Sequence, residues 1–244
     1  MKLILSVGMA VAAVTLAPAI GSATAASSAQ VTPACHTFPV PLPPFLPCTP
    51  SLDAAAVTQC STAYFDGDPR LGPERLPAPI VSEVGTQVIL YQRTGAEPAQ
   101  QFLTEYYDPA ANGGKGGWRY PPSNGYVIDS HGQPVEAPHT LRVGHLIDRY
   151  GSEFGAFLAP QGTPYAERSI PPQSLDTSDP AYTCNYHRYR VIKEFTVEAG
   201  PIAPWFKQRG GGEQYQVDGA LLPGAPNRPN VMWLVGNGYL QRLN

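Results

Sequence analysis

Short segments rich in β-branched and aromatic residues fill the C-terminal half of the chain, and glycine or proline turns separate them. This pattern is typical of strands joined by tight turns. We expect strands at residues 141–147, 154–158, 186–195 and 213–217, and a last helical turn or strand at 231–243. From Tyr186 to Val191 the chemistry of the side chains alternates, as a half-buried strand requires.

Helical patterns are fewer and lie in the N-terminal half. One helix is expected over residues 51–59, and Pro98 stands near the first turn of another that extends to about Tyr106. Residues 112–117, with four glycines, predict a flexible break. The fold class is therefore α+β and mainly β, with a compact β core over 119–244. Before it, residues 26–118 form a disulfide-tied part that is helical and proline-rich.

The first 25 residues have the pattern of a signal peptide. Lys2 precedes an uncharged run over residues 3–20, and small residues at 22–25 offer a cleavage site. A membrane anchor is the alternative, because about 18 apolar residues span a bilayer. Pro18 and the small-residue exit favour cleavage near Ala26, which predicts a secreted, extracellular or cell-surface protein with no membrane segment after cleavage.

Four cysteines follow the leader, and an even number in a secreted chain predicts two disulfides. Three pairings are open; we expect a local Cys35–Cys48 bridge and a long-range Cys60–Cys184 bridge. No C-x-x-C pair and no zinc-finger spacing occurs, so we expect no metal site.

Composition narrows the partners. The chain has 16 basic and 19 acidic residues and no basic stripe, which argues against nucleic acid as the main ligand. It has 28 prolines and 24 glycines, but its 10% aromatic residues can fill a core. We therefore expect a loop-rich, ordered domain rather than a disordered one.

Three stretches gather arginines, flat aromatic residues and glycines: residues 146–160, 162–172 and 203–215. Arginine forks suit phosphate oxygens, and aromatic faces suit a planar base or a pyridinium ring. The set fits a dinucleotide. Neither a Walker nor a Rossmann loop is present, and no G-x-S-x-G motif supports esterase chemistry.

In this order and at these spacings, the stretches resemble the tuberculosis necrotizing toxin domain and the secreted fungal NAD glycohydrolases. The resemblance covers about residues 140–243 and is most specific from Asp148 through Pro171 and in Gly-Gly-Gly-x-Gln-Tyr at 210–215. It implies a toxin-like β core and hydrolysis of NAD or NADP to nicotinamide and ADP-ribose, with NAD as substrate and no cofactor. The fungal relatives also suggest a homodimer.

The resemblance implies roles for individual residues. Gln214 matches the glutamine on which the family's activity depends, Arg168 would grip the pyrophosphate, and His187 would lie in the catalytic cleft. The substrate-binding positions are Arg149, Tyr150 and Phe157, with Arg149 and Phe157 beside the nicotinamide and ribose. Two departures concern the substrate loops: Lys207 stands where relatives more often have glycine, and residues 173–185 form an insert.

The implied chemistry needs no strong acid. Nicotinamide is a cation within NAD and leaves as a neutral molecule, so the protein has to tolerate an oxocarbenium-like ribose and place a water. Orientation supplies much of the rate, about 7–11 kcal/mol in the best intramolecular examples.

Each candidate also has an ordinary explanation. Arg149 follows Asp148 and Arg168 follows Glu167, so both arginines could form surface ion pairs of little energetic value. Phe157 is a core candidate because it is flanked by alanine and leucine, and His187 on a strand could be structural.

Two other functions remain open at this point. An ADP-ribosyltransferase toxin would use the same substrate, but the Glu- or Gln-x-Glu pair usual in that class is absent. A non-catalytic secreted surface-binding protein would keep the arginine and aromatic cleft without turnover.

Overall fold

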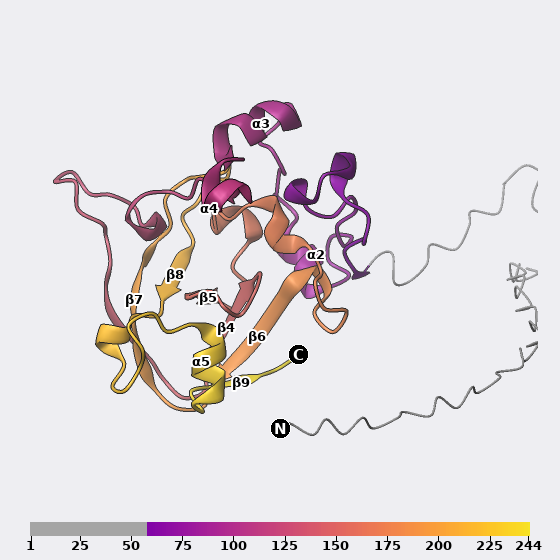
Figure 1. The fold of residues 1–244 in the computed structure, drawn as a ribbon. Coiled ribbons are helices and arrows are strands. Elements are labelled where there is room, and N and C mark those ends of the chain that lie inside the picture. The colour runs from indigo at the N-terminus through magenta and orange to yellow at the C-terminus, as the bar shows by residue number, and fades with distance from the viewer. Residues whose placement is uncertain (1–57) are drawn as a thin grey trace, which may run out of the picture. The chain divides into compact units, whose positions relative to one another are not determined.

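A seven-stranded antiparallel sheet organises residues 58–244, the part of the chain that the computed structural model describes (Figure 1). The strand order is β3-β7-β8-β5-β4-β6-β9. The strands are β3 (Ala137–Leu141), β4 (Leu146–Tyr150), β5 (Phe157–Pro160), β6 (Tyr186–Val191), β7 (Phe195–Pro201), β8 (Glu213–Gln216) and β9 (Leu240–Arg242).

One face of this sheet forms the main hydrophobic core. Leu141, Val191 and Val197 are fully buried in it. Helix α5 (Val231–Gly236) covers the core and contributes Val231 and Leu234. The helix begins at Asn230, whose side chain accepts a hydrogen bond from the backbone N–H of Trp233 at 2.8 Å, as an N-cap residue does.

The part of the chain before the sheet contains short elements. They are α2 (Glu83–Gln87), α3 (Ala99–Tyr106), α4 (Ala111–Gly114) and a two-stranded ribbon of β1 (Tyr107–Asp108) with β2 (Gly117–Trp118).

Short 3₁₀ helices occur along the whole described chain: η1 (Phe65–Gly67), η2 (Pro69–Leu71), η3 (Ser123–Gly125), η4 (Tyr165–Glu167), η5 (Pro172–Leu175), η6 (Thr183–Asn185) and η7 (Gly219–Leu221). In Figure 1, α3 and α4 lie at the opposite end of the sheet from α5.

Two smaller apolar clusters join these elements to the sheet. Val84 and Val88 of the α2 region pack with Tyr150, Tyr165 and Leu175 in one cluster. In the other, α3 packs its buried face, including Phe102 and Tyr106, against Phe206. Residues 58–118 and 119–244 belong to one compact unit, Leu52–Asn244. A functional boundary near residue 118 stays a prediction.

The long-range disulfide prediction is confirmed, because Cys60 and Cys184 are bonded across 124 residues. Cys35 and Cys48 lie outside the described residues, as do the leader and nearly all of the helix expected at 51–59. Within residues 58–244 no helix is long and apolar enough to cross a membrane.

The α+β, mainly β fold class is confirmed, together with several elements. The helix after Pro98 ends at Tyr106, and β8 occupies the segment expected at 213–217. The last segment, expected as a helical turn or a strand, contains both α5 and β9.

The strand expected at 141–147 was wrong. Leu141 ends β3 and Leu146 begins β4, and a turn joins them. Gly144 has φ +94, a backbone conformation that glycine adopts without strain. Periodicity could not reveal this turn because aliphatic residues flank it on both sides.

Two other strand boundaries were also wrong. The segment expected at 186–195 is divided after Val191, where the chain turns and the N–H groups of Ile192 and Lys193 both donate to the carbonyl of Tyr239. The segment expected at 154–158 begins only at Phe157, because Ser152 and Gly155 form a turn before it.

Candidate active site

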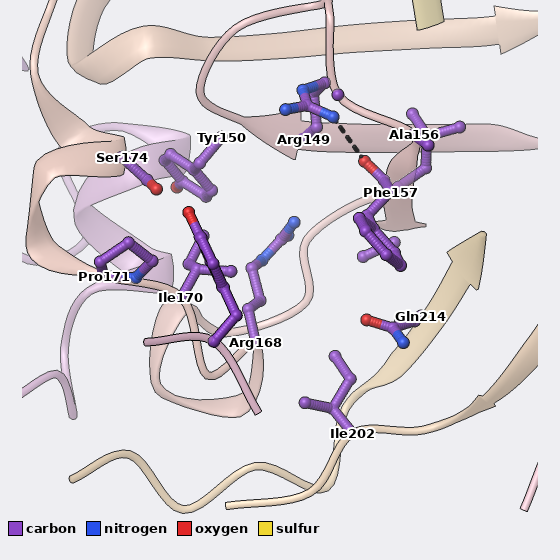
Figure 2. Close-up of a pocket in the computed structure, with 14 residues that line it drawn as sticks. Arg149, Tyr150, Ala156, Phe157, Arg168, Ile170, Pro171, Ser174, Ile202 and Gln214 are labelled. Carbon is purple, nitrogen blue, oxygen red and sulfur yellow. Dashed lines mark hydrogen bonds between the residues drawn. The ribbon is translucent and has the colours of Figure 1, made fainter. Parts of the chain in front are cut away.

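A cavity of about 310 Å³ opens where β4, β5 and β8 meet the loop after β5 (Figure 2). This volume lies at the lower end of the range for small-molecule sites. Its walls are Tyr120, Arg149, Tyr150, Gly155, Ala156, Phe157, Leu158, Ala159, Arg168, Ile170, Pro171, Ser174, Ile202 and Gln214. Five of the six residues expected at the site therefore meet in one cavity.

Gln214 presents its amide oxygen to the cavity. Its amide nitrogen donates a hydrogen bond to the carbonyl of Asn124 at 2.8 Å, which fixes the amide plane. The amide oxygen then faces the cavity, as Figure 2 shows. The residue is only 8% exposed, so this oxygen acts as an oriented, partly desolvated hydrogen-bond acceptor.

The three glycines before β8 allow the backbone to place Gln214 at the cavity. A Cβ at Gly210 would lie 2.6 Å from the carbonyl oxygen of Ile202, and one at Gly212 would lie 2.9 Å from the carbonyl oxygen of Glu167. Both contacts are backbone and cannot move aside. The glycine run thus permits a close approach between two loops that a side chain would prevent.

Arg149 brings an unpaired positive charge to the cavity. Its Nη1 donates to the carbonyl of Phe157 at 2.8 Å and its Nε to the carbonyl of Gly151 at 3.2 Å. No carboxylate of residues 58–244 lies within ion-pair distance of it. Burial lowers the pKa of Arg149, so an anionic ligand would be favoured beside it. Gly155 makes room, because a Cβ there would lie 2.5 Å from Nη2.

Arg168, in contrast, is held by the protein itself. Its Nη1 forms an ion pair with Asp148 at 2.7 Å, while Nε and Nη2 donate to the carbonyl of Thr163. Both side chains are almost fully buried. Burial alone would lower the pKa of Arg168, but the charge of Asp148 raises it, so the guanidinium remains charged.

The surface ion pairs between sequence neighbours do not form. Successive side chains of a strand point to opposite faces, so Asp148 turns away from Arg149 and meets Arg168. Glu167 pairs with Arg209 instead of Arg168. The residue after Arg168, Ser169, has φ +47, a strained conformation for a residue with a side chain, and such strain is common at functional sites.

The two aromatic candidates have different environments. Phe157 is 39% exposed and lines the cavity instead of the core, which excludes the core interpretation. Tyr150 is buried, and its ring lies 5.1 Å from the guanidinium of Arg168. The phenol of Tyr150 donates to Gln87, and burial raises its pKa.

His187 does not line the cavity. It pairs with Arg149 across β4 and β6, and its ring lies 4.2 Å from that of Tyr182 and 6.5 Å from that of Tyr189. Its Nε2 is 3.1 Å from the side-chain oxygen of Asn185. Burial lowers the pKa of His187, so the ring is neutral at pH 7. The catalytic role expected from the resemblance stays a prediction. The geometry favours a structural role, in which His187 packs on the paired strands β4 and β6.

A second hollow of about 260 Å³ adjoins the first and shares Tyr120, Pro171 and Ser174 with it. Trp118 also lines it and donates a hydrogen bond to Gln173 at 2.9 Å. Sequence reasoning missed Tyr120, which precedes the stretches that carry the resemblance. A cluster of aromatic residues after the glycine-rich break was the available signal.

The cavity lacks acidic and metal-binding groups. No Asp or Glu side chain belongs to its walls. Across residues 58–244, no group of three or more His, Cys, Asp or Glu side chains could hold a metal ion. Its chemistry therefore rests on one unpaired guanidinium, one oriented amide and aromatic surface.

Comparisons with known proteins agree with the sequence motifs. The family model described as "Tuberculosis necrotizing toxin" matches residues 140–243. The conidial surface nicotinamide adenine dinucleotide glycohydrolase nadA of Aspergillus fumigatus is 44% identical over 192 residues, which cover 78% of this chain and 75% of that protein.

Two solved structures are also similar. Tuberculosis necrotizing toxin, solved with its immunity factor, gives a TM-score of 0.46 at 20% identity, over 73% of this chain and 79% of its own. Rhs1-CT, solved with its cognate immunity protein, gives 0.28 at 13% identity, over 45% of this chain and 77% of its own.

Proposed function

This chain belongs to the tuberculosis necrotizing toxin family, and on that premise we propose that it is an NAD glycohydrolase. It hydrolyses the N-glycosidic bond between nicotinamide and ribose and releases ADP-ribose. The name of the Aspergillus relative supports the substrate. The proposal includes NADP, whose cleavage the same assay tests by nicotinamide release.

The observation that carries the proposal is a cavity with an unpaired arginine and an oriented amide, but no carboxylate. Most glycosidases need a carboxylic acid because their leaving group must be protonated. NAD does not have this requirement, since the electron pair of the breaking bond neutralises the pyridinium nitrogen. A site without an acid therefore suits this substrate better than an ordinary sugar.

The reaction then proceeds in two bond changes. The C1′–N1 bond breaks and neutral nicotinamide departs, which leaves positive charge on the ribose. The oxygen of a water attacks C1′, and its proton passes to solvent. The amide oxygen of Gln214 accepts a hydrogen bond from that water or from a ribose hydroxyl and stabilises the charge.

The two arginines have different parts in this proposal. Arg149, with no acidic partner, anchors a phosphate, and the Phe157 ring packs on the nicotinamide. Arg168 contributes its charge from the wall, because a direct grip on the pyrophosphate would compete with Asp148. The rest of the dinucleotide extends past Tyr120 into the second hollow.

The test is release of nicotinamide and ADP-ribose from NAD by the purified protein. We expect Arg149→Met to lower kcat/KM about ten- to hundredfold, since a hydrogen bond to a charged group contributes about 1.5–3 kcal/mol. Arg190→Met is the matched control, because Arg190 is an exposed arginine on the neighbouring strand β6.

The products separate the proposal from its alternatives. Free ADP-ribose supports hydrolysis. Labelled acceptor protein would indicate an ADP-ribosyltransferase, and unchanged NAD would indicate a non-catalytic binding protein. Equal activity of Arg149→Met and Arg190→Met would reject the role of Arg149.

We also propose that the protein is secreted or displayed at the cell surface after cleavage near Ala26. The leader pattern supports this, and so does the conidial surface location in the name of the relative. N-terminal sequencing of protein recovered from the medium or the cell wall is the test. The homodimer suggested by the resemblance is tested by light scattering of the same material.

A further inference from the structure

A residue of α2 contacts two residues of the cavity wall from outside the segment that the family model matches. Helix α2 (Glu83–Gln87) precedes residues 140–243 by more than fifty positions. The Ser82 side chain caps it by accepting from the N–H of Gly85 at 2.9 Å. Val84 and Val88 bury one side of this segment, and this packing turns Gln87 inward, where it is 3% exposed.

The amide of Gln87 makes three hydrogen bonds to side chains. Its oxygen accepts from the phenol of Tyr150 at 3.0 Å and from Nη2 of Arg168 at 3.2 Å. Its nitrogen donates to the phenol oxygen of Tyr186 at 2.9 Å. Both lone pairs of the amide oxygen are therefore used, by two residues that line the cavity.

These bonds close a ring. Arg168 contacts Asp148 at 2.7 Å, and the phenol of Tyr186 donates to the other oxygen of Asp148 at 2.7 Å. Tyr186 receives the amide N–H of Gln87, and the oxygen of Gln87 receives Arg168. The carbonyl of Thr163 also holds Nε and Nη2 of this guanidinium. Gln87 adds a third contact to Arg168, the one that ties its orientation to Tyr150 and Tyr186.

The direction of the Tyr186 proton follows from its neighbours. Glu83 also lies near, 2.9 Å from the phenol oxygen, but it already receives Gln161 at 2.7 Å and Arg188 at 3.1 Å. Asp148 carries the charge that faces Arg168, so donation of the single phenol proton to Asp148 best completes the ring.

We propose that Gln87 is a positioning residue of the active site, which sets the orientation of Arg168 and Tyr150 in the cavity wall. The proposal rests on the proposed NAD hydrolysis for its readout of activity. It makes α2 a part of the site and not only a covering element.

The decisive variant is Gln87→Met, which keeps the length of the side chain and removes every hydrogen bond. We expect kcat/KM to fall about ten- to hundredfold, because ångström-scale misplacement in an active site costs on that order. A merely structural residue would lower Tm and leave kcat/KM of the folded protein unchanged. Thr86→Ala, an exposed change on the same helix, should alter neither.

A second variant keeps the proposal testable if Gln87→Met does not fold. Gln87→Glu retains the acceptor for Arg168 and Tyr150, so kcat should recover to within about tenfold of the native value. The new carboxylate contacts Arg168, and Asp148 and Glu83 contact the Tyr186 phenol that Gln87 also contacts. The carboxylate should raise KM for an anionic substrate, more strongly at high pH, where it is charged.

The outcomes are distinct. Native kcat/KM in Gln87→Met, or native KM and pH profile in Gln87→Glu, would overturn the proposal. If the native protein releases no nicotinamide, the proposed function fails, and the arginine side-chain NMR signal of Arg168 becomes the readout. That signal should shift in Gln87→Met and not in Thr86→Ala; an unchanged signal would refute the ring.

Discussion

At the scale of single residues, the difference between Arg149 and Arg168 comes from their partners. Both are arginines that line the same cavity, but only Arg168 has an acidic partner. Arg149 is anchored by two backbone carbonyls, which fix its position without cancelling its charge. A residue type predicted from sequence therefore acquires its role from groups far away in the chain.

The first residue-scale prediction concerns Gln214. Gln214→Ala and Gln214→Lys should leave the fold intact and abolish measurable turnover, because the oriented oxygen is lost. Loss of one such preorganised group typically costs about a hundred- to a thousandfold in kcat. Nicotinamide release and a thermal melt measure both effects, with the exposed Gln241→Ala on β9 as control. Near-normal NAD consumption by Gln214→Ala would exclude this role.

Arg168 should matter for stability as well as activity. Arg168→Met leaves Asp148 buried without a counter-charge, which typically costs about 3–5 kcal/mol. Adding Asp148→Asn to Arg168→Met should restore part of that loss. Urea denaturation of the single and double variants tests this; equal stability of Arg168→Met and the native protein would contradict the buried pair.

Asp176 should make stability depend on pH. Burial raises the pKa of Asp176 from 3.8 to about 7, against the smaller opposing effect of Arg93. The folded protein therefore keeps a proton that the unfolded chain has released. Its stabilising contribution is complete below about pH 4 and is lost as pH rises towards 7.

Asp176→Asn should thus raise Tm above that of the native protein at about pH 8 and have little effect at about pH 4. The Asp176 side chain is partly exposed to solvent, so the difference in Tm should be modest. Thermal melts across this range are the measurement, and a difference in Tm that does not change with pH would contradict it.

At the scale of elements, the turn after Trp205 explains the unusual Lys207. Lys207 has φ +54, a conformation that favours glycine, which is the residue that the family resemblance leads one to expect there. Its ammonium group lies 2.9 Å from Glu97, which precedes α3, and 2.8 Å from Glu105 in the last turn of α3. The ion pairs offset the backbone strain.

Replacing Lys207 should separate these two effects. Lys207→Ala loses both ion pairs and keeps the strain, whereas Lys207→Gly loses the pairs and relieves the strain. We expect the native protein and the glycine variant each to have a higher Tm than the alanine variant. An alanine variant as stable as the native protein would show that the ion pairs do not contribute, and a glycine variant no more stable than the alanine variant would show that the strain does not.

At the scale of the whole unit, the Cys60–Cys184 disulfide ties the start of the described chain to the 173–185 insert. Both cysteines pack in the cluster with Tyr150 and Tyr165, next to the cavity. Closure of so long a loop restricts the unfolded chain, and loss of such a bridge typically costs about 2–5 kcal/mol.

The double variant Cys60→Ala with Cys184→Ala should therefore unfold at lower denaturant concentration than the native protein. We also expect a lower kcat/KM, because Tyr150 loses part of its support. Fluorescence-monitored urea denaturation and the nicotinamide assay test both. Unchanged denaturation in the double variant would show that packing alone secures the insert.

Much of the architecture could be predicted from local sequence. Turn residues and β-branched segments indicated a mainly β fold, and the placement of Pro98 predicted α3. The strand end at Gly144 failed because aliphatic residues flank the turn, and the one at Ile192 failed because its hydrogen-bond partner, Tyr239, is distant in the chain. The pattern of neighbouring residues in the sequence does not show which distant residue will accept a hydrogen bond.

The sequence by itself determined the chemistry that this protein can offer: its arginines, its glutamine after three glycines, its paired cysteines and the order in which they occur. Only the tertiary structure decided how they are used. It paired Asp148 with Arg168, left Arg149 without an acidic partner, and brought Gln87 of an earlier helix against Arg168 and Tyr150 of the cavity wall. The physical reason is that charge and hydrogen-bond partners are set by distance in space, and residues about eighty positions apart become neighbours only when the sheet and α2 pack together.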